Sequence, residues 1–518
     1  MLAIAEFPLL KSPGFITRFP WSALNPPSSG WPANRAAVDP GNLMAARDQM
    51  AVSLGFHIIL SCFGVAFPAL IYVMHRRGLR GDADALVLAK RWSKVAAVLF
   101  AVGAVSGTVL SLEMGLLWPG LMSTYGDVIG LPFALEGIAF FIEAIFLGIY
   151  LFGWDRLPPK VHIRTLIPIM ASGLFGTFCI LAVNSWMNAP AGFTLVNGRP
   201  TNIEPLSAIF NRALWPQFLH MWVGAYVVVG FTVAAVYATG LRKGRDDRLH
   251  RMAFTASFAM ATGFALVQPL IGHVAGMRLA TEQPSKLAAM ELATTTESHA
   301  PLTLGGVLID GRVRGGLSIP QIGSLLARGG FGRSITGLDQ IPADQQAPAN
   351  VVHIAFQLMV AIGTGLAAFG MFYFWRRRRR RRRHRDRDRD RDLIESRRFL
   401  RLATLTGPAA IIALEAGWVT TEVGRQPWIV YRVLRVADAV TPNGGIWFSF
   451  SGVVVLYALL GLATWLTLRS MSQRWRATGD VDLPTPYGPP REPPADLPRP
   501  DDLVGVAAAS SSSWRTAP

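Results

Sequence analysis

The side chains with the clearest capacity for chemistry form one stripe in the last quarter of the chain. Glu415, Trp418, Glu422 and Arg425 are spaced three, four and three residues apart, so they share one face of an α-helix. The residues before them are nearly all apolar, and a carboxylate inside a membrane helix costs roughly 2.5–3.5 kcal/mol on insertion scales. Such a group usually faces a protein interior and has a function. The alternative is a glutamate–Arg425 ion pair that only packs two helices.

Two histidines and a methionine offer ligands for a transition metal. Of nine histidines, only His57 and His220 fall well inside apolar segments, in DQMAVSLGFHIILSCFG and WPQFLHMWVGAY. Met359, in HIAFQLMVAIGTG, adds a soft thioether, and a histidine and a methionine on neighbouring helices can hold a six-coordinate heme iron. Taken one at a time, each histidine could instead hydrogen-bond across a helix pair, and the methionine could simply pack.

Further ionisable residues have similar surroundings. Glu136 and Glu143, in PFALEGIAFFIEAIFLGIYLFG, are seven residues apart and share a helix face, which suits a proton relay or an iron ligand. The alternative is that both carboxyl groups only bond to neighbouring helices. Arg47 and Glu113 could each pair with a propionate or belong to a proton path. The alternative is that each is an anchor at the membrane interface.

The elements that must position these residues are membrane helices. Of the 518 residues, 51% are hydrophobic and only 16% are charged, which excludes an ordinary soluble globule. We predict an all-α polytopic membrane helix bundle, with about nine transmembrane helices and a long outer loop after the sixth. The net charge of +17 is interpreted as topology signals in short loops, and the two cysteines, Cys62 and Cys179, suggest no disulfide framework.

The chain divides into seven predicted parts. Basic residues gather in the odd-numbered loops, which places those loops in the cytoplasm and the N-terminus outside. The run from Arg376 to Arg383 is interpreted as a topology and lipid signal, with RNA binding as the alternative. The parts are an irregular N-terminal extension (1–44), transmembrane helices 1–6 (45–275), a long outer loop (276–350), transmembrane helix 7 (351–375), an Arg-rich cytoplasmic loop (376–400), transmembrane helices 8–9 (401–470) and a disordered tail (471–518).

One segment carries a specific resemblance. GWVTTEVGRQPW is similar to the Gly-Trp-x-x-x-Glu-x-Gly-Arg-Gln-Pro-Trp signature of subunit I of the cytochrome bd-type ubiquinol and menaquinol oxidases. The likeness extends from about residue 44 to 470. It implies a multi-pass subunit of the bacterial cytoplasmic membrane, paired with a second membrane subunit. The implied cofactors are low-spin and high-spin heme b, with heme d or a third heme b.

The resemblance also implies roles for individual residues. His220 and Met359 match the axial pair of the low-spin heme b, while His57 and Glu422 match ligands of the two high-spin hemes. The other matches are Lys286 and Glu291 (the quinol loop), Glu136 and Glu143 (paired glutamates beside the high-spin hemes), Glu113 (the proton path), Trp418 and Arg425 (residues among or near the hemes), Arg47 (ten residues before His57, as in the family), and Asn184 and Trp186 (a polar segment ending the fourth span).

Several positions depart from the family pattern. Glu136 and Glu143 are seven residues apart, where the family usually has eight. Gln357 stands where an arginine usually precedes the ligand methionine, and His273 stands where the family often has an aspartate. The element that begins at Glu113 also differs, reading EMGLL in place of Glu-Phe-Gln-Phe-Gly. The chain is therefore expected to be a divergent branch.

The activity implied by the resemblance is an electrogenic, bd-type quinol:oxygen oxidoreductase of a respiratory chain that reduces oxygen to water. Quinol is expected to dock near Lys286 and Glu291, and protons to enter through membrane carboxylates from the cytoplasm. Expected partners are the second subunit, ubiquinol or menaquinol, oxygen and membrane lipids, and no nucleic acid. Two alternatives stay open: a heme b carrier that oxidises quinol without reducing oxygen, and an ion-coupled transporter.

Overall fold

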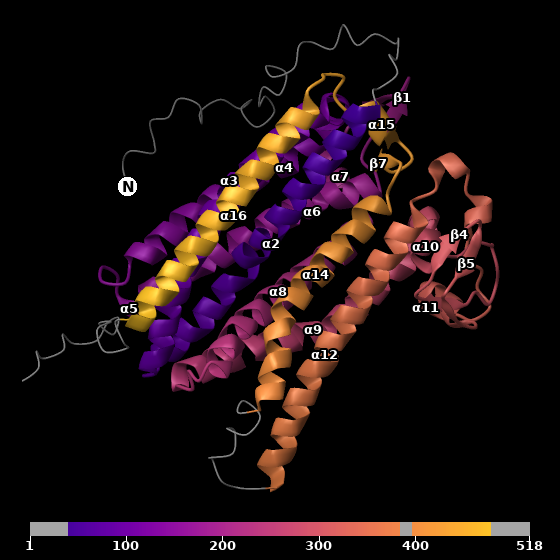
Figure 1. Ribbon diagram of the computed structural model, residues 1–518. Coiled ribbons are helices and arrows are strands. Elements are labelled where there is room, and N and C mark those ends of the chain that lie inside the picture. Colours follow the sequence, from indigo (N-terminus) through magenta and orange to yellow (C-terminus); the bar gives the residue numbers. More distant parts are fainter. Residues whose placement is uncertain (1–39, 384–395, 478–518) are drawn as a thin grey trace, which may run out of the picture.

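A computed structural model describes residues 40–383 and 396–477 (Figure 1). Most of the predicted N-terminal extension, the centre of the Arg-rich loop and most of the predicted disordered tail lie outside these residues.

Long helices dominate the described part of the chain, as predicted. Within it, nine helical segments are long and apolar enough to cross a membrane. Figure 1 shows them as an elongated bundle of roughly aligned rods. The main helices are α2 (Pro40–Gly78), α3 (Ala83–Leu117), α4 (Pro119–Phe152), α6 (Leu166–Asn188, directly after the short α5, Pro159–Arg164), α8 (Leu214–Arg242), α9 (Arg248–Glu282), α12 (Ala349–Arg383), α14 (Arg397–Val423) and α16 (Ile446–Ala477).

Several helices run past the predicted spans. Helix α9 continues to Glu282, so the following segment begins later than the expected residue 276. Helix α12 continues through the arginine run to Arg383, which the sequence analysis placed in a loop. Arginine has a high helix propensity, so a run of it can extend an apolar helix without a break.

The helices pack as two four-helix groups. In the first, α8 and α12 each pack against both α9 and α14, so α8 and α12 lie across the group from one another. In the second, α2 and α4 each pack against both α3 and α6, and α16 covers α2 and α3. Helix α8 joins the groups through α2 and α6. Small residues allow close approach: a Cβ added at Gly230 of α8 would lie 2.8 Å from the Ala261 Cβ of α9.

The two ends of the bundle differ in character. One end, here called the basic end, carries the turns after α2, α4 and α8 and the start of α14. There the Arg248 guanidinium donates to Asp82 at 2.8 and 2.9 Å, and Arg77 donates to Asp82 at 2.6 Å. Burial raises the pKa of Asp82, but hydrogen bonds from Arg248 and Arg77 outweigh it, so the pKa is lowered overall. These bonds tie the α2–α3 turn to the start of α9.

The opposite end, here called the loop end, carries small ordered elements. The segment between α9 and α12 folds into short helices and antiparallel strand pairs beside the bundle (Figure 1). Its elements are α10 (Pro284–Glu291), β3 (Leu302–Leu304) paired with β6 (Leu317–Ile319), β4 (Val307–Ile309) paired with β5 (Arg312–Arg314), α11 (Ile322–Arg328), η2 (Leu338–Gln340) and η3 (Ala343–Gln345). The rest of this end holds β1 (Thr194–Val196) with β2 (Arg199–Thr201), α7 (Pro205–Ile209), β7 (Trp428–Val430) with β8 (Leu434–Arg435), and α15 (Val436–Ala439).

Candidate functional site

His220 projects from α8 toward α9 in the first four-helix group. Gln268 of α9 donates from Nε2 to the His220 carbonyl at 3.0 Å and lies 3.3 Å from the His220 Nε2. A Cβ at Gly272 would lie 3.1 Å from the His220 Cε1, so the glycine makes room for the ring. The other ring nitrogen, Nδ1, is buried and has no hydrogen-bond partner in the described structure. Such an atom costs about 1–3 kcal/mol unless something else satisfies it.

Met359 projects from α12, across the same group. A Cβ at Gly417 of α14 would lie 3.0 Å from the Met359 sulfur, so the thioether rests against α14 directly before Trp418. Trp418 itself packs on the apolar cluster that includes Leu181 of α6 and Phe218 of α8. The structure therefore places the imidazole and the thioether on opposite helices of one four-helix group, as a shared ligand would require.

His57 occupies the second group, on α2. Its Nδ1 lies 2.9 Å from the Ser106 hydroxyl of α3, and that hydroxyl donates to the Gly103 carbonyl at 3.0 Å. Since the single hydroxyl hydrogen is used, the Ser106 oxygen accepts the Nδ1–H of His57. This arrangement leaves the lone pair on Nε2, which is the arrangement typical of metal-ligating histidines. Ser106 was not among the predicted site residues, because nothing in the apolar run shows which helix faces His57.

Glu422 lies at the end of α14 and is held by two groups. Asn184 of α6 donates to its carboxylate at 2.8 Å, and Arg425 forms a close ion pair with it. The helix-packing ion pair offered as an alternative above is therefore present. It does not use the whole carboxylate, which has about four lone-pair positions and can accept further ligands.

Two guanidinium groups with buried N–H atoms lie in this part of the structure, on Arg425 and on Arg47. The Arg425 side chain is 4% exposed, and its Nε and Nη1 have no hydrogen-bond partner in the described chain. Arg47 donates from Nη2 to the Gln426 side chain at 2.5 Å, and its Nε is also buried without a partner. Buried guanidinium N–H groups without acceptors suit an anionic ligand such as a carboxylate.

A hydrogen-bonded path joins Glu422 to the segment after α9. Asn188 donates to the Asn184 carbonyl at 2.9 Å, one helical turn earlier on α6. Lys286 of α10 donates from Nζ to the Asn188 Oδ1 at 2.8 Å, and Gln283 donates to the same oxygen at 2.9 Å. Asn188 was not among the predicted residues, although its position four residues after Asn184 in VNSWMNAP puts both on one helix face.

Lys286 lies close to the Gly-Arg-Gln-Pro-Trp motif. A Cβ at Gly424 would lie 2.8 Å from the Lys286 Cγ, so the lysine stem crosses directly over this glycine. Burial lowers the pKa of Lys286 to about 7, with a further contribution from the positive charge of Arg425 and an opposing one from Glu422. The ammonium group is therefore poised between its charged and neutral forms near neutral pH.

Glu291 ends α10, five residues after Lys286. Its Oε2 is buried with no hydrogen-bond partner among the residues described, and burial raises its pKa to about 7. The fully buried His353 of α12 anchors α10. One His353 ring nitrogen bonds to the Met290 carbonyl at 2.6 Å and the other to the Gly305 carbonyl at 3.0 Å. His353 was not among the predicted site residues.

The remaining carboxylates face glycines or hydroxyls on neighbouring helices. A Cβ at Gly64 of α2 or at Gly173 of α6 would lie 3.4 or 3.5 Å from a Glu143 oxygen, so Glu143 lies between these two helices. Glu136 lies beside α6, two helical turns from Glu143 on the same face. Helix α6 packs against both α4 and α2 (Figure 1).

Two further glutamates lie elsewhere. Glu113 accepts hydrogen bonds from Gln49 at 3.0 Å and Ser53 at 2.8 Å, so it joins α3 to α2 rather than to the glutamates of α4. Glu415 faces α2, where a Cβ at Gly55 would lie 3.3 Å from its Oε2. Glu415 and Glu422 therefore share a helix face but contact different neighbours.

The comparisons with known proteins agree with a helical membrane protein. The sequence profile of the family "Cytochrome bd terminal oxidase subunit I" matches residues 45–475. The chain belongs to this family, as the signature segment predicted.

Two curated relatives and one solved structure are similar over most of their length. A putative cytochrome bd menaquinol oxidase subunit I of Bacillus subtilis strain 168 is 33% identical over 434 residues, covering 82% of this chain and 94% of the relative. A cytochrome bd ubiquinol oxidase subunit 1 of the same strain is 29% identical over 467 residues, covering 86% and 97%. The bd oxidase structure from Geobacillus thermodenitrificans superposes with a TM-score of 0.78 at 36% identity, covering 85% of this chain and 99% of that one.

Proposed function

We propose that this chain is the heme-carrying, quinol-oxidising subunit of a bd-type respiratory oxidase that reduces oxygen to water. Membership of the subunit I family supports the oxidase class. The observation that carries the site assignment is the bonded path from Lys286 through Asn188 and Asn184 to Glu422. It joins α10, which we propose meets quinol, with the half-buried carboxylate of Glu422, which we propose meets iron.

The described residues fit hemes at three places. His220 and Met359 would hold a low-spin heme b, since the unsatisfied Nδ1 and the opposed thioether suit an enclosed iron site. His57 and Glu422 would each serve a high-spin heme, of which one is heme d or a further heme b. When bound, these groups supply one-electron carriers and an iron at which oxygen is reduced.

Arg47, Arg425 and Trp418 would position these cofactors. The free N–H groups of Arg47 and Arg425 suit the propionate groups of a porphyrin, which would satisfy them. The Arg425 charge also compensates the Glu422 carboxylate. Trp418 places a rigid aromatic ring of α14 against the apolar cluster of α6 and α8.

Quinol would bind beside α10. A carboxyl group whose pKa is near 7 can accept a proton from a quinol hydroxyl, and Glu291 has that property. Lys286 can donate a hydrogen bond to the other end of the head group or to its oxidised product. The two Bacillus relatives are described as menaquinol and ubiquinol oxidases, so either quinol fits the family.

Protons for water formation would reach the bundle through its carboxylates. Glu136 and Glu143 lie along one face of α4, which is turned toward α2 and α6. Glu113 is a separate hydrogen-bonded carboxylate between α2 and α3. We place the basic end in the cytoplasm because basic turns remain on that side. The chain would then be a multi-pass protein of the bacterial cytoplasmic membrane.

A second membrane subunit would cover one side of the bundle. Within the most apolar stretch, only 6% of α3 and 11% of α16 is buried inside this chain. Helix faces that are not buried within the chain are available for lipid or for another subunit. The relevant partners of the chain are thus a second subunit, a quinol, oxygen and lipid.

Oxygen uptake by the purified complex tests the proposal. With excess quinol, a bd-type oxidase consumes oxygen and shows heme bands that change on reduction. A protein that is reduced by quinol without oxygen uptake would be the heme b carrier instead. A purified complex without heme would overturn both readings.

A further inference from the structure

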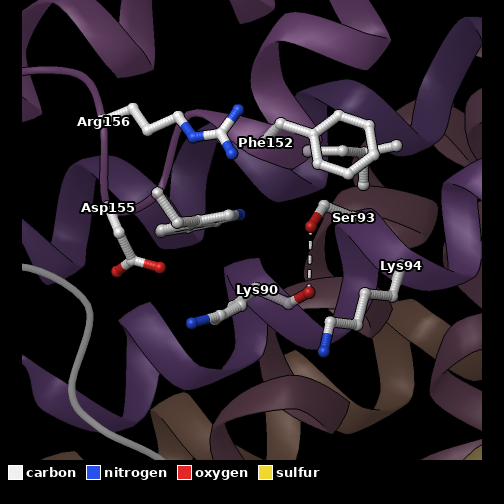
Figure 2. Close-up of a pocket in the computed structure, with 8 residues that line it drawn as sticks. Lys90, Ser93, Lys94, Phe152, Asp155 and Arg156 are labelled. Carbon is white, nitrogen blue, oxygen red and sulfur yellow. Dashed lines mark hydrogen bonds between the residues drawn. The ribbon is translucent and has the colours of Figure 1, made fainter.

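A hollow of about 200 Å³ opens at the basic end, away from every ligand described above (Figure 2). It lies between the first part of α3 and the turn that follows α4. The lining residues are Lys90, Ser93 and Lys94 of α3, Leu151 and Phe152 of α4, and Trp154, Asp155 and Arg156 of the turn. The proposed oxidase chemistry gives none of these residues a role.

The hollow carries excess positive charge. Lys90, Lys94 and Arg156 face a single carboxylate, that of Asp155. None of the three cations is in an ion pair with a carboxylate of the described chain. Lys90 lies with its Nζ 6.0 Å from the centre of the Trp154 ring, and Figure 2 shows Lys90 and Arg156 on opposite sides of the space. Two lysines and an arginine around one cavity suit a phosphate.

An apolar strip on α4 leads away from the hollow. Ile145, Ile149 and Phe152 are spaced four and three residues apart, so they share one face of the helix. All three are exposed, Phe152 at 70%. The strip is an exposed apolar surface on a helix long enough to cross a membrane, and it ends at a cationic hollow with Trp154 in its wall. Tryptophan is favoured at the level of lipid head groups.

We propose that this hollow binds the phosphate of an anionic phospholipid, with Lys90, Lys94 and Arg156 around the head group and the acyl chains along Ile145, Ile149 and Phe152. Anionic lipids of the cytoplasmic leaflet meet the basic end of the bundle, where a juxtamembrane cation contributes about fivefold in affinity. Continuity between the hollow and the apolar strip favours a lipid over free phosphate. The site is independent of the proposed heme and quinol sites.

Native mass spectrometry of the purified complex tests the proposal. The test variant combines Lys90→Gln, Lys94→Gln and Arg156→Gln. The matched control combines Lys160→Gln, Arg164→Gln and Lys243→Gln, which removes the same charge from exposed positions at the same end. Each complex is exchanged into vesicles that contain phosphatidylglycerol or only phosphatidylcholine, and the retained lipids are counted after extraction into detergent.

We expect wild type and control to retain one phosphatidylglycerol that the test variant binds about a hundredfold more weakly, with unchanged heme spectra in all three. The single Arg156→Gln variant, at an exposed side chain, should show a smaller loss in the same direction. Equal retention of phosphatidylglycerol by test variant and control would overturn the proposal. So would equal retention of phosphatidylcholine by wild type, full displacement of the lipid by millimolar inorganic phosphate, or loss of the second subunit without loss of lipid.

Discussion

Lys286 donates a hydrogen bond to the Asn188 Oδ1 at 2.8 Å, and this bond joins the segment after α9 to the end of α6. Asn188 in turn donates to the Asn184 carbonyl, and Asn184 donates to Glu422. Three hydrogen bonds thus connect Lys286, which is proposed to meet quinol, with Glu422, which is proposed to meet iron. We therefore expect a change in the charge of Lys286 to alter the hydrogen bonds of Asn188, Asn184 and Glu422.

Removing Asn188 should break the path without removing a proposed ligand. In Asn188→Ala the buried Lys286 loses its acceptor, which costs about 1–3 kcal/mol for a buried polar group left unpaired. If this free energy raises the barrier to quinol oxidation, the rate should fall by roughly tenfold or more, while the heme spectrum is retained. Steady-state oxygen uptake and reduced-minus-oxidised spectra measure the two effects. Asn202→Ala, at an exposed position of the same end, is the control.

The pH profile of quinol oxidation should report Glu291. Its pKa of about 7 means that the carboxylate able to accept a proton appears as the pH rises through 7. The rate at limiting quinol should therefore rise across this range in wild type and be lower and flatter in Glu291→Gln. An identical pH profile in the variant would remove Glu291 from the proton step.

The contributions of Glu291 and Lys286 to stability should depend on pH in opposite directions. The pKa of Glu291 is raised from 4.5 to about 7 on folding, so its stabilising contribution is complete below about 4.5 and is lost as the pH rises to 7. The pKa of Lys286 is lowered from 10.5 to about 7, so its contribution is complete above 10.5 and is lost as the pH falls to 7. Thermal unfolding measured between pH 5 and 9 checks this. Glu291→Gln should remove the loss of stability between pH 5 and 7, and Lys286→Met should remove the loss of stability as the pH falls from 9 to 7.

His353 should hold the segment between α9 and α12 in place. In His353→Ala both bonds from α12 to the Met290 and Gly305 carbonyls are lost. We expect faster proteolysis between residues 283 and 348 and a raised KM for quinol, with heme content unchanged. His299→Ala, an exposed histidine of the same segment, should behave as wild type. Equal proteolysis of both variants would show that His353 is not the anchor.

Ser106 should set the ring orientation of His57. Ser106→Ala removes the acceptor of the Nδ1–H bond, and loss of such a support typically costs 10–100-fold in metal affinity. We expect a shifted high-spin heme spectrum and easier heme loss on dilution. Ser111→Ala, exposed on the same helix, should change neither. A spectrum unaffected by Ser106→Ala would argue against His57 as a ligand.

The helices could be predicted because a bilayer demands about 20 apolar residues for each crossing, and that demand is visible in composition. The common face of Glu415 and Glu422 also followed from helical spacing. Their neighbours could not be predicted: Glu415 meets Gly55 of α2, whereas Glu422 meets Asn184 of α6. Which helix lies against a given face is decided by tertiary packing, which local sequence does not record.

The same limit explains the residues that sequence reasoning missed. Ser106, Asn188 and His353 matter because of partners on other helices, not because of their own surroundings in the chain. The end of α12 could not be predicted for another reason: the charged run ends the apolar pattern, whereas arginine favours helix.

The visible spectrum and pyridine-hemochrome content of His220→Ala membranes test the central claim most directly. His220 is proposed to hold the low-spin heme opposite Met359, so the variant should lose the low-spin band and about one heme per complex. His273→Ala, an exposed histidine on α9, should keep both. An unchanged low-spin band and heme content in His220→Ala would contradict the proposed ligand set.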